Sequence, residues 1–167
     1  MRRKDREVTK KDEIMRIIND CRVMVLGLND SDQPYLVPLN FTWQQNKDEL
    51  NLYFHCAKKG YKLDLIKINN NCSFVLFNDL GIKTINNARA ATNYYESIFG
   101  TGKAEVITNF DRKKEVAALL LKKYNLEEVL INNKEDNDAA IDNTAFVKIT
   151  VKSVSAKANR EEKHDRH

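Results

Sequence analysis

The chain has 167 residues, of which 42% are apolar and 31% are charged, and its net charge is only +4. This length suits one domain with a substantial core, and the mixed, nearly balanced charges argue against a dominant role in binding nucleic acid. No apolar run approaches membrane-spanning length, and no apolar stretch follows the basic N-terminus as it would in a secretory signal.

The first predicted element is a helix that begins just after Thr9. The Thr9 hydroxyl can accept backbone N–H bonds at the start of this helix, and Asp12 in its first turn suits the helix dipole. Apolar residues then recur at helical spacing and define one buried face: Ile14, Ile17, Ile18 and Cys21.

Three strands separated by polar turns are predicted next. Residues 23–28 form an apolar run, residues 29–34 are rich in turn-forming types, and residues 35–43 again have strand character. After a second polar turn at 44–49, residues 50–55 alternate between apolar and polar side chains. The simplest arrangement of these strands is an antiparallel meander.

The middle of the chain predicts a short helix over 60–68 and a strand over 72–77. A longer strand over 94–108 follows, and it is interrupted by Gly100 and Gly102. Glycines inside a strand indicate a bend or a bulge, which a closing barrel needs.

The last third predicts one amphipathic helix, which Asp111 can cap, and one half-buried strand over 145–151. The polar stretch 127–143 between them has no clear assignment, and the charged tail from Lys157 is expected to fray. Several strands with few helices and no βαβ alternation predict an α+β, mainly β fold, namely an antiparallel barrel with peripheral helices. We expect one domain over residues 1–155 and a charged tail over 156–167.

The stretch 37–41 differs from a plain strand because it contains Pro38. Proline cannot donate to a β-ladder, so we expect Pro38 at a sheet edge or a bulge, where main-chain groups remain free to meet a ligand. Asn40 adds a side chain that both donates and accepts hydrogen bonds. Such a strand suits a planar heterocycle with a polar rim, although a barrel edge with Asn40 facing water has the same pattern.

The stretch 54–62 joins the end of a strand to the start of a helix. Free N–H groups at a helix start favour an anion, and the small residues Cys56 and Ala57 permit its close approach. Lysines in the same stretch would suit a phosphate, although a solvated lysine-rich loop has the same composition. These lysines are Lys58, Lys59 and Lys62.

Five stretches carry a resemblance to a known family: MRRKDRE at 1–7, YLVPLNF at 35–41, YFHCA at 53–57, GYK at 60–62 and YESIFGTG at 95–102. In order and spacing they resemble the nitroimidazole-resistance branch of the pyridoxamine phosphate oxidase-like split barrels. The strand around 146–151 and the lysines after it also fit that pattern.

The resemblance implies a split barrel that binds FMN at the interface of a homodimer. In such a protein 37–41 would run along the isoalloxazine ring, and 53–55 would pass beneath the ribityl chain. Residues 55–57 would start the phosphate cradle, and Lys62 would close it as the cation. Ser97 and Ile98 would reach the flavin from the partner subunit. The implied cofactor-binding residues are Val37, Pro38, Leu39, Asn40, Phe41, Tyr53, Phe54, His55, Cys56, Ala57, Lys62, Ser97 and Ile98.

Two positions depart from the family pattern. Cys56 stands where relatives often have Ser or Gly, and Tyr61 stands where they often have His or Arg. Because Tyr61 supplies no positive charge, we expect another base to compensate. The candidates are Lys58, Lys59 and the N-terminal arginines Arg2, Arg3 and Arg6.

No catalytic residue is assigned with certainty from the sequence. His55 is a candidate because imidazole can carry a proton near neutral pH, and a hydrogen-bonded residue at a strand end is the alternative. Cys56 could be a reactive thiol at a helix start, but a small packing residue is the preferred interpretation. Scattered cysteines (Cys21, Cys56 and Cys72) favour a reducing cytoplasm and no metal site.

The leading hypothesis is an FMN-dependent oxidoreductase that reduces small nitro-type or other electrophilic substrates. The flavin would perform the chemistry, so the absence of a catalytic triad is no objection. A non-catalytic flavin carrier or redox sensor would use the same residues. A barrel that binds nucleic acid through its lysine-rich loop is a third hypothesis, which the few candidate base-stacking aromatics disfavour. FAD, a deazaflavin and the identity of the electron donor and acceptor stay open.

Overall fold

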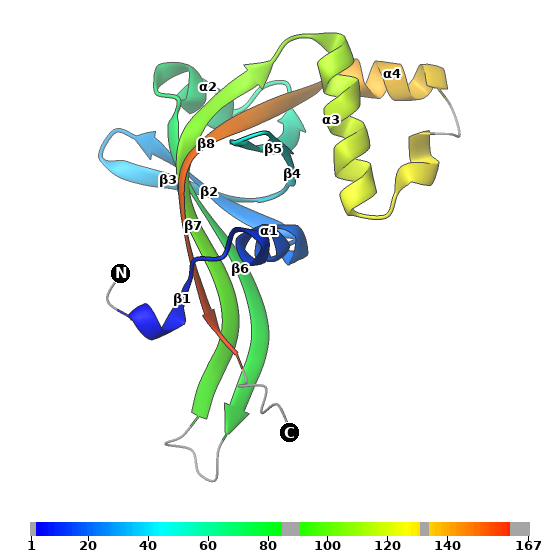
Figure 1. Ribbon diagram of the computed structural model, residues 1–167. Coiled ribbons are helices and arrows are strands. Elements are labelled where there is room, and N and C mark those ends of the chain that lie inside the picture. The colour runs from blue at the N-terminus through cyan, green and yellow to red at the C-terminus, as the bar shows by residue number, and fades with distance from the viewer. Residues whose placement is uncertain (1–2, 85–90, 131–133, 161–167) are drawn as a thin grey trace.

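Figure 1 shows the computed structural model, which describes residues 3–84, 91–130 and 134–160. The four α-helices in this part of the chain are α1 (Lys11–Asp20), α2 (Tyr61–Ile68), α3 (Phe110–Lys123) and α4 (Lys134–Asp142), and two short 3₁₀ helices are η1 (Lys4–Arg6) and η3 (Glu127–Leu130). The strands are β1 (Glu7–Val8), β2 (Val23–Asp30), β3 (Gln33–Asn40), β4 (Thr42–Asn46), β5 (Glu49–Ala57), β6 (Asn71–Thr84), β7 (Ala91–Ile107) and β8 (Thr144–Asn159).

All the strands belong to one antiparallel sheet with the order β3-β2-β6-β7-β8-β5-β4, and β1 adds to β8. The sheet curls around a core but leaves β3 and β4 as its two ends. The helices lie around this curled sheet, with α1 on one side and α3 and α4 together on another (Figure 1). The predicted split barrel with peripheral helices is therefore confirmed. No helix in the described ranges is long and apolar enough to cross a membrane.

The predicted three-strand meander is wrong. β2 pairs with β3 and β4 pairs with β5, but β3 and β4 lie at opposite ends of the sheet. The chain passes from one end to the other at Phe41, whose side chain is fully buried in the core. Strand pattern continues across this residue in the sequence, so the pattern alone could not reveal the change of partner.

β5 is buried on both faces over its central residues, although apolar and polar side chains alternate over 50–55 in the sequence. Its four central residues, 51–54, are all buried. Phe54 belongs to the barrel core, whereas Tyr53 packs in a second cluster with Val116 and Leu120 of α3. Because α3 covers the outer face of β5, the alternating residues meet apolar neighbours on both sides.

β7 bends where Gly100 and Gly102 lie, as predicted. Its register with β8 shifts between Thr101 and Gly102. A Cβ atom at Gly102 would lie 2.6 Å from the Thr150 carbonyl oxygen, and one at Gly100 would overlap the ring of Phe74. Both glycines are therefore required by the close approach of neighbouring groups.

The helix caps differ from those predicted. α1 follows Lys10 and has no side-chain cap, so Thr9 does not serve in that role. α3 is capped by Asn109 rather than Asp111, and the Asn109 Oδ1 accepts the Arg112 N–H at 2.8 Å. The cap therefore lies two residues earlier than expected, because the helix begins at Phe110.

The C-terminal strand is longer than predicted. β8 continues through Lys157 to Asn159, held between β7 and β1, so the expected fraying does not begin at Lys157. Arg160 then forms ion pairs with Glu13 of α1 and with the buried Glu96, the latter at 2.6 Å. Residues 161–167 of the predicted tail lie outside the described residues.

The contact between Gly100 and Phe74 yields a prediction for stability. Gly100→Ala should lower the free energy of unfolding by about 2 kcal/mol, because overpacking a tight core costs about 1–3 kcal/mol. Gly27→Ala is the matched control, since its nearest neighbour at 3.2 Å is the exposed Leu36 side chain, which can move. Urea unfolding measures both variants, and equal destabilisation would contradict a specific clash with Phe74.

Candidate functional site

β3 provides the first predicted site segment at an end of the sheet. Pro38 lies on this edge strand, as the missing ladder donor requires. Val37 and Leu39 pack against the core, whereas Pro38 and Asn40 are exposed on the outer face. The Asn40 amide donates to the Arg22 carbonyl at 3.3 Å, which steadies the end of the strand. One long side of β3 therefore has main-chain groups that no neighbouring strand pairs.

Phe41, at the end of this segment, is held by α3. Its N–H donates to the Tyr124 hydroxyl at 3.1 Å, and that hydroxyl donates in turn to the Arg22 carbonyl at 2.6 Å. The ring is buried beneath the Lys123 ammonium, 3.7 Å from its centroid. Phe41 thus fixes the crossing between β3 and β4, and its side chain is not available to a ligand in this chain.

The second predicted segment connects β5 to α2. Gly60, the N-cap residue of α2, has a φ of 152°, and no side chain caps the helix. The Leu63 N–H reaches the Gly60 carbonyl at 2.9 Å, but the first N–H groups of the helix face outward from the turn. The turn therefore presents backbone donors together with the lysines that flank Gly60.

The lysines of this turn are not equivalent. Lys58 lies 3.5 Å from Asp142 of α4, whereas Lys59 and Lys62 form no ion pair with any residue that the structure describes. Lys62 is close enough to Cys56 for its charge to affect that thiol. Burial raises the pKa of Cys56, although the positive charge of Lys62 opposes the rise. A raised thiol pKa favours the packing role of Cys56 over a reactive thiolate.

The two segments meet at Tyr61, the first residue of α2. The Tyr61 hydroxyl donates to Asp30 at 2.6 Å, and its ring meets that of Tyr35 edge to face at 5.7 Å. The carboxylate acceptor also raises the pKa of the Tyr61 hydroxyl. Tyr61 therefore links the start of α2 to the β2–β3 hairpin. At the position where relatives often have a basic residue, this chain has a residue with a structural role.

Residues 53–55 of β5 face different environments. Tyr53 and Phe54 are fully buried, so only their main chains could contact a ligand. Tyr53 accepts a hydrogen bond from Arg112 of α3 at 2.6 Å. The exposed His55 borders a small apolar pocket of about 250 Å³ beside α3 and α4, where its ring lies 6.2 Å from that of Phe146.

Ser97 and Ile98 of β7 are separated from the other predicted site residues. β2 and β6 lie between β7 and β3, which places β7 roughly 14 Å from β3 across the sheet. Ser97 is half-buried on the outer face, whereas the Ile98 side chain is fully buried in the core. Ser97 therefore cannot meet the same small ligand as the β5–α2 turn within one chain unless that ligand spans the sheet.

Of the bases that could compensate for Tyr61, Lys59 remains available. Arg3 pairs with Asp5 at 2.5 Å, Arg6 lies over the Tyr95 ring, and Lys58 pairs with Asp142. Arg2 lies outside the described residues. No group of three or more potential metal-ligating side chains occurs within the described ranges.

A separate groove meets the predicted segments only at Lys58. It has a volume of about 890 Å³ and runs beside the C-terminal half of α2, the end of β7 and the start of β8. Leu63 and Ile66 form part of its apolar wall, while Lys58 and Lys113 lie at its border. None of the predicted cofactor-binding residues lines this groove.

Comparison with known proteins places this geometry in context. A family model described as pyridoxamine 5'-phosphate oxidase matches residues 10–158. A proposed 5-nitroimidazole antibiotic resistance protein from Bacteroides thetaiotaomicron superposes with a TM-score of 0.72 at 24% identity, over 92% of this chain and 90% of that chain. No protein of the curated collection matches the chain significantly.

Two further solved structures share the fold at lower identity. The flavocytochrome Anf3 from Azotobacter vinelandii has a TM-score of 0.78 at 16% identity, over 96% of this chain and 72% of that chain. A FAD- and haem-binding protein from Mycobacterium smegmatis has a TM-score of 0.74 at 13% identity, over 93% of this chain and 74% of that chain. The shared fold is therefore one that other proteins use to bind flavins.

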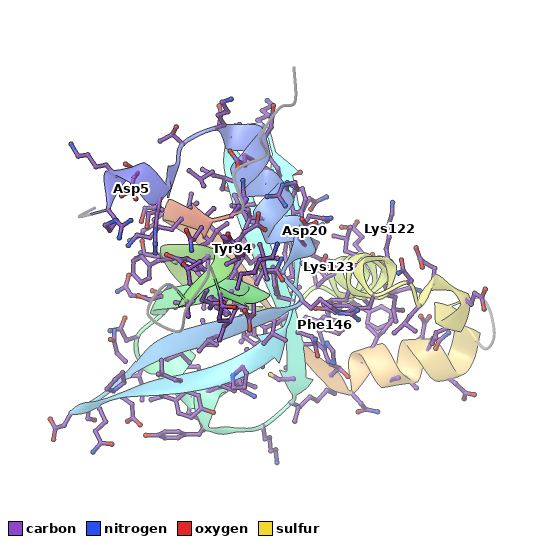
Figure 2. All side chains as sticks on the ribbon, turned by 90° about the horizontal axis from the view of Figure 1, so that it is seen from below. Asp5, Asp20, Tyr94, Lys122, Lys123 and Phe146 are labelled. Carbon is purple, nitrogen blue, oxygen red and sulfur yellow. The ribbon has the colours of Figure 1, made fainter. Side chains whose placement is uncertain are left out.

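The lysine over Phe41 yields a prediction for pH dependence. Figure 2 shows Lys123 beside Asp20, where α3 meets the end of α1. Its ammonium donates to the Ile18 carbonyl at 3.1 Å, yet burial lowers its pKa from 10.5 to about 8. Between these two pH values the unfolded chain binds a proton that the folded chain releases, so the free energy of unfolding should rise with pH.

Lys123→Met should remove this rise, which can reach about 3 kcal/mol because one pKa unit corresponds to about 1.4 kcal/mol. Urea unfolding between about pH 8 and 10.5 measures the slope in both proteins. Lys122→Met is the control, because Lys122 is exposed on the same helix. The same slope in the Lys123→Met variant and in the unaltered protein would contradict the prediction.

Proposed function

Because the chain belongs to the pyridoxamine 5'-phosphate oxidase family, we propose that it binds FMN and acts as a flavin-dependent oxidoreductase. The observation that carries this proposal is the turn between β5 and α2. There the start of α2 has no side-chain cap, Lys59 and Lys62 form no ion pair with any described residue, and Tyr61 contacts the β2–β3 hairpin. A phosphate and a planar polar ring are the two chemical groups that this arrangement suits.

The turn fits a phosphate through both geometry and charge. No side chain among the described residues caps the start of α2, and a helix start favours negative charge. Lys62 in the first turn would close the cradle, and Lys59 would provide the second positive charge. Charge-assisted hydrogen bonds of this kind hold phosphates strongly.

β3 suits the isoalloxazine ring because one long side of this edge strand has main-chain groups that no neighbouring strand pairs. An isoalloxazine ring carries donors and acceptors on its rim, and the main chain of an edge strand offers both. Val37 to Phe41 would run along that rim, with Pro38 and Asn40 on the outer face of the strand. When bound, the flavin supplies the electron transfer, while these residues bind and orient it and keep water away.

The outer face of the sheet supports a homodimer. Val25 on β2 lies opposite Val75 on β6, and Val75 lies opposite Phe99 on β7, so three exposed apolar side chains form one continuous row. A row of this kind on a flat sheet suits contact with a second copy of the chain. Ser97 lies on the same face, so the partner subunit would bring it to the flavin.

The substrate class proposed is a small electrophile, including nitro compounds. The similarity to a proposed nitroimidazole-resistance protein supports this choice, and the flavin would receive its electrons from a reduced nicotinamide or another donor. A flavin carrier or redox sensor would use the same binding residues. Turnover of a reduced nicotinamide with a nitroaromatic acceptor distinguishes the enzyme from the carrier.

The test of the proposal is the visible spectrum of the purified protein, followed by titration with FMN and, separately, with FAD. We expect bound flavin or stoichiometric uptake, with FMN preferred because the cradle fits a single phosphate. Lys62→Gln should weaken FMN binding about 10- to 100-fold, since losing a charge-assisted hydrogen bond costs about 1.5–3 kcal/mol. Lys67→Gln on the same helix is the matched control, because Lys67 pairs with Asp64. A colourless protein that binds neither FMN nor FAD would overturn the proposal.

The shared site is tested by Ser97→Arg. The serine is half-buried on an open face, so a long side chain can extend outward while each barrel still folds. We expect the variant to lose FMN binding, because the arginine would occupy the space between the subunits. Circular dichroism checks the fold and sedimentation gives the oligomeric state. Unchanged FMN affinity in this variant would argue against a flavin site shared between subunits.

A further inference from the structure

The groove of about 890 Å³ beside α2 follows an open edge of the sheet. β6 begins at Asn71, which pairs with Lys103, whereas β7 continues to Ile107. Beyond Lys103, β7 therefore has β8 on one side and no described strand on the other. Residues 104–108 border the groove along this open side.

The main-chain groups of Val106 are directed into this open side. The Ala104 N–H donates to the Asn70 carbonyl at 2.8 Å, so the main-chain groups of Ala104 point away from β8. Alternate residues of an antiparallel strand direct these groups to the same side, so the N–H and C=O of Val106 also point away from β8. No described residue pairs with them. An unpaired edge of this kind is a template for another extended chain.

The side chains around this edge form an apolar surface. Val106 lies on the same face of β7 as the buried Ala104, yet its side chain is 37% exposed. Leu63 and Ile66 of α2 form the apolar wall opposite. In a strand added beside β7, alternate side chains would meet this wall and the others would face outward.

The groove also carries an excess of positive charge. Among the described residues, its charged lining consists of Glu105 and three lysines, namely Lys58, Lys67 and Lys113. Glu105 is already paired with Lys148 at 2.8 Å. Lys58 and Lys67 have acids 3.5 and 3.4 Å away on the exposed surface, where such pairs contribute little. Lys113 forms no ion pair with any residue that the structure describes.

We propose that this groove binds an extended acidic peptide segment of a partner protein, which adds to the sheet as a strand beside β7. The segment pairs with the main chain of Val106, and its apolar side chains pack against Leu63 and Ile66. Its carboxylates lie near the lysines of the groove. This is recognition by strand addition, in which the main chain gives affinity and the side chains give specificity.

Charge favours this partner over a second copy of the chain. Two copies placed edge to edge at β7 would bring the same three lysines together, and such a juxtaposition of like charges opposes association. An acidic segment instead neutralises them. The site is independent of the proposed flavin site, because none of the predicted cofactor-binding residues lines the groove.

The probe for this proposal is a fluorescein-labelled peptide of alternating glutamate and valine residues, whose binding to the full chain is read by fluorescence anisotropy. We expect saturable binding that the double variant Lys67→Gln, Lys113→Gln weakens about fivefold, since exposed ion pairs contribute modestly. The matched control is the double variant Lys122→Gln, Lys152→Gln, whose lysines are exposed and lie outside the groove. No saturable binding, or equal affinity in the two double variants, would overturn the proposal.

Main-chain pairing is tested by two probes of the same sequence that are N-methylated at alternate amides. We expect one methylated probe to lose binding and the other to retain it, because an added strand pairs only alternate amides with its neighbour. If both methylated probes bind equally well, or if a peptide of glutamates alone binds as tightly as the alternating one, charge alone holds the peptide and the proposal fails.

Val106→Pro tests the same contact from the protein. Proline removes the Val106 N–H and is tolerated on an unpaired strand edge, so we expect the fold to persist, checked by circular dichroism, and peptide binding to be lost. Val106→Ala keeps the N–H and should retain most of the affinity. Retained binding in Val106→Pro contradicts the proposal. A change in oligomeric state in that variant, measured by sedimentation, would identify the edge as an interface between copies and would also overturn it.

Discussion

The rest of the structure depends on the hydrogen-bonded ladders of β8. This strand pairs with β7 along most of its length, with β5 over its first half and with β1 near its end. The first half pairs with β5, whose end leads into the turn before α2, whereas the second half extends beside β6 and β7 (Figure 1). Such a long strand can serve both regions only because β7 bends at Gly102, where the Thr150 carbonyl leaves no room for a side chain.

The two halves of the sheet are covered differently by the helices. α3 covers the β4–β5–β8 side, where Arg112 reaches the Tyr53 hydroxyl and Lys123 lies over Phe41. On the outer face of β2, β6 and β7, Val25, Val75 and Phe99 are exposed and lie in one row. Burying apolar surface is favourable, and this exposed row is the surface on which the proposed homodimer rests.

Local pattern was sufficient to predict most elements but not their partners. The helix at 60–68 and the strands at 72–77 and 145–151 were predicted because side-chain period and turn residues are local signals. The positions of β3 and β4 at opposite ends of the sheet depend on non-local pairing, which periodicity cannot show. For the predicted site, Pro38 indicated an edge strand, which the sheet order confirms, whereas the phosphate role of the stretch 54–62 stays a prediction. Lys157 was instead assigned to a frayed tail, because only its pairing with Glu7 and Ser97 shows that it is ordered.

The distribution of charge links these observations. Three arginines form ion pairs within the chain: Arg16 and Arg160 neutralise the buried Glu96, and Arg112 pairs with Glu115. The pairs of Arg16 and Arg160 with Glu96 link α1, β7 and the end of β8. Burial acts to raise the pKa of Glu96, but the two arginines lower it. Lys59 and Lys62 at one end of β8, and Lys157 near the other, have no counter-ions among the described residues. The buried carboxylate is thus neutralised inside the fold, whereas these lysines of the β5–α2 turn and of β8 carry positive charge, at two separate places, that no described residue neutralises.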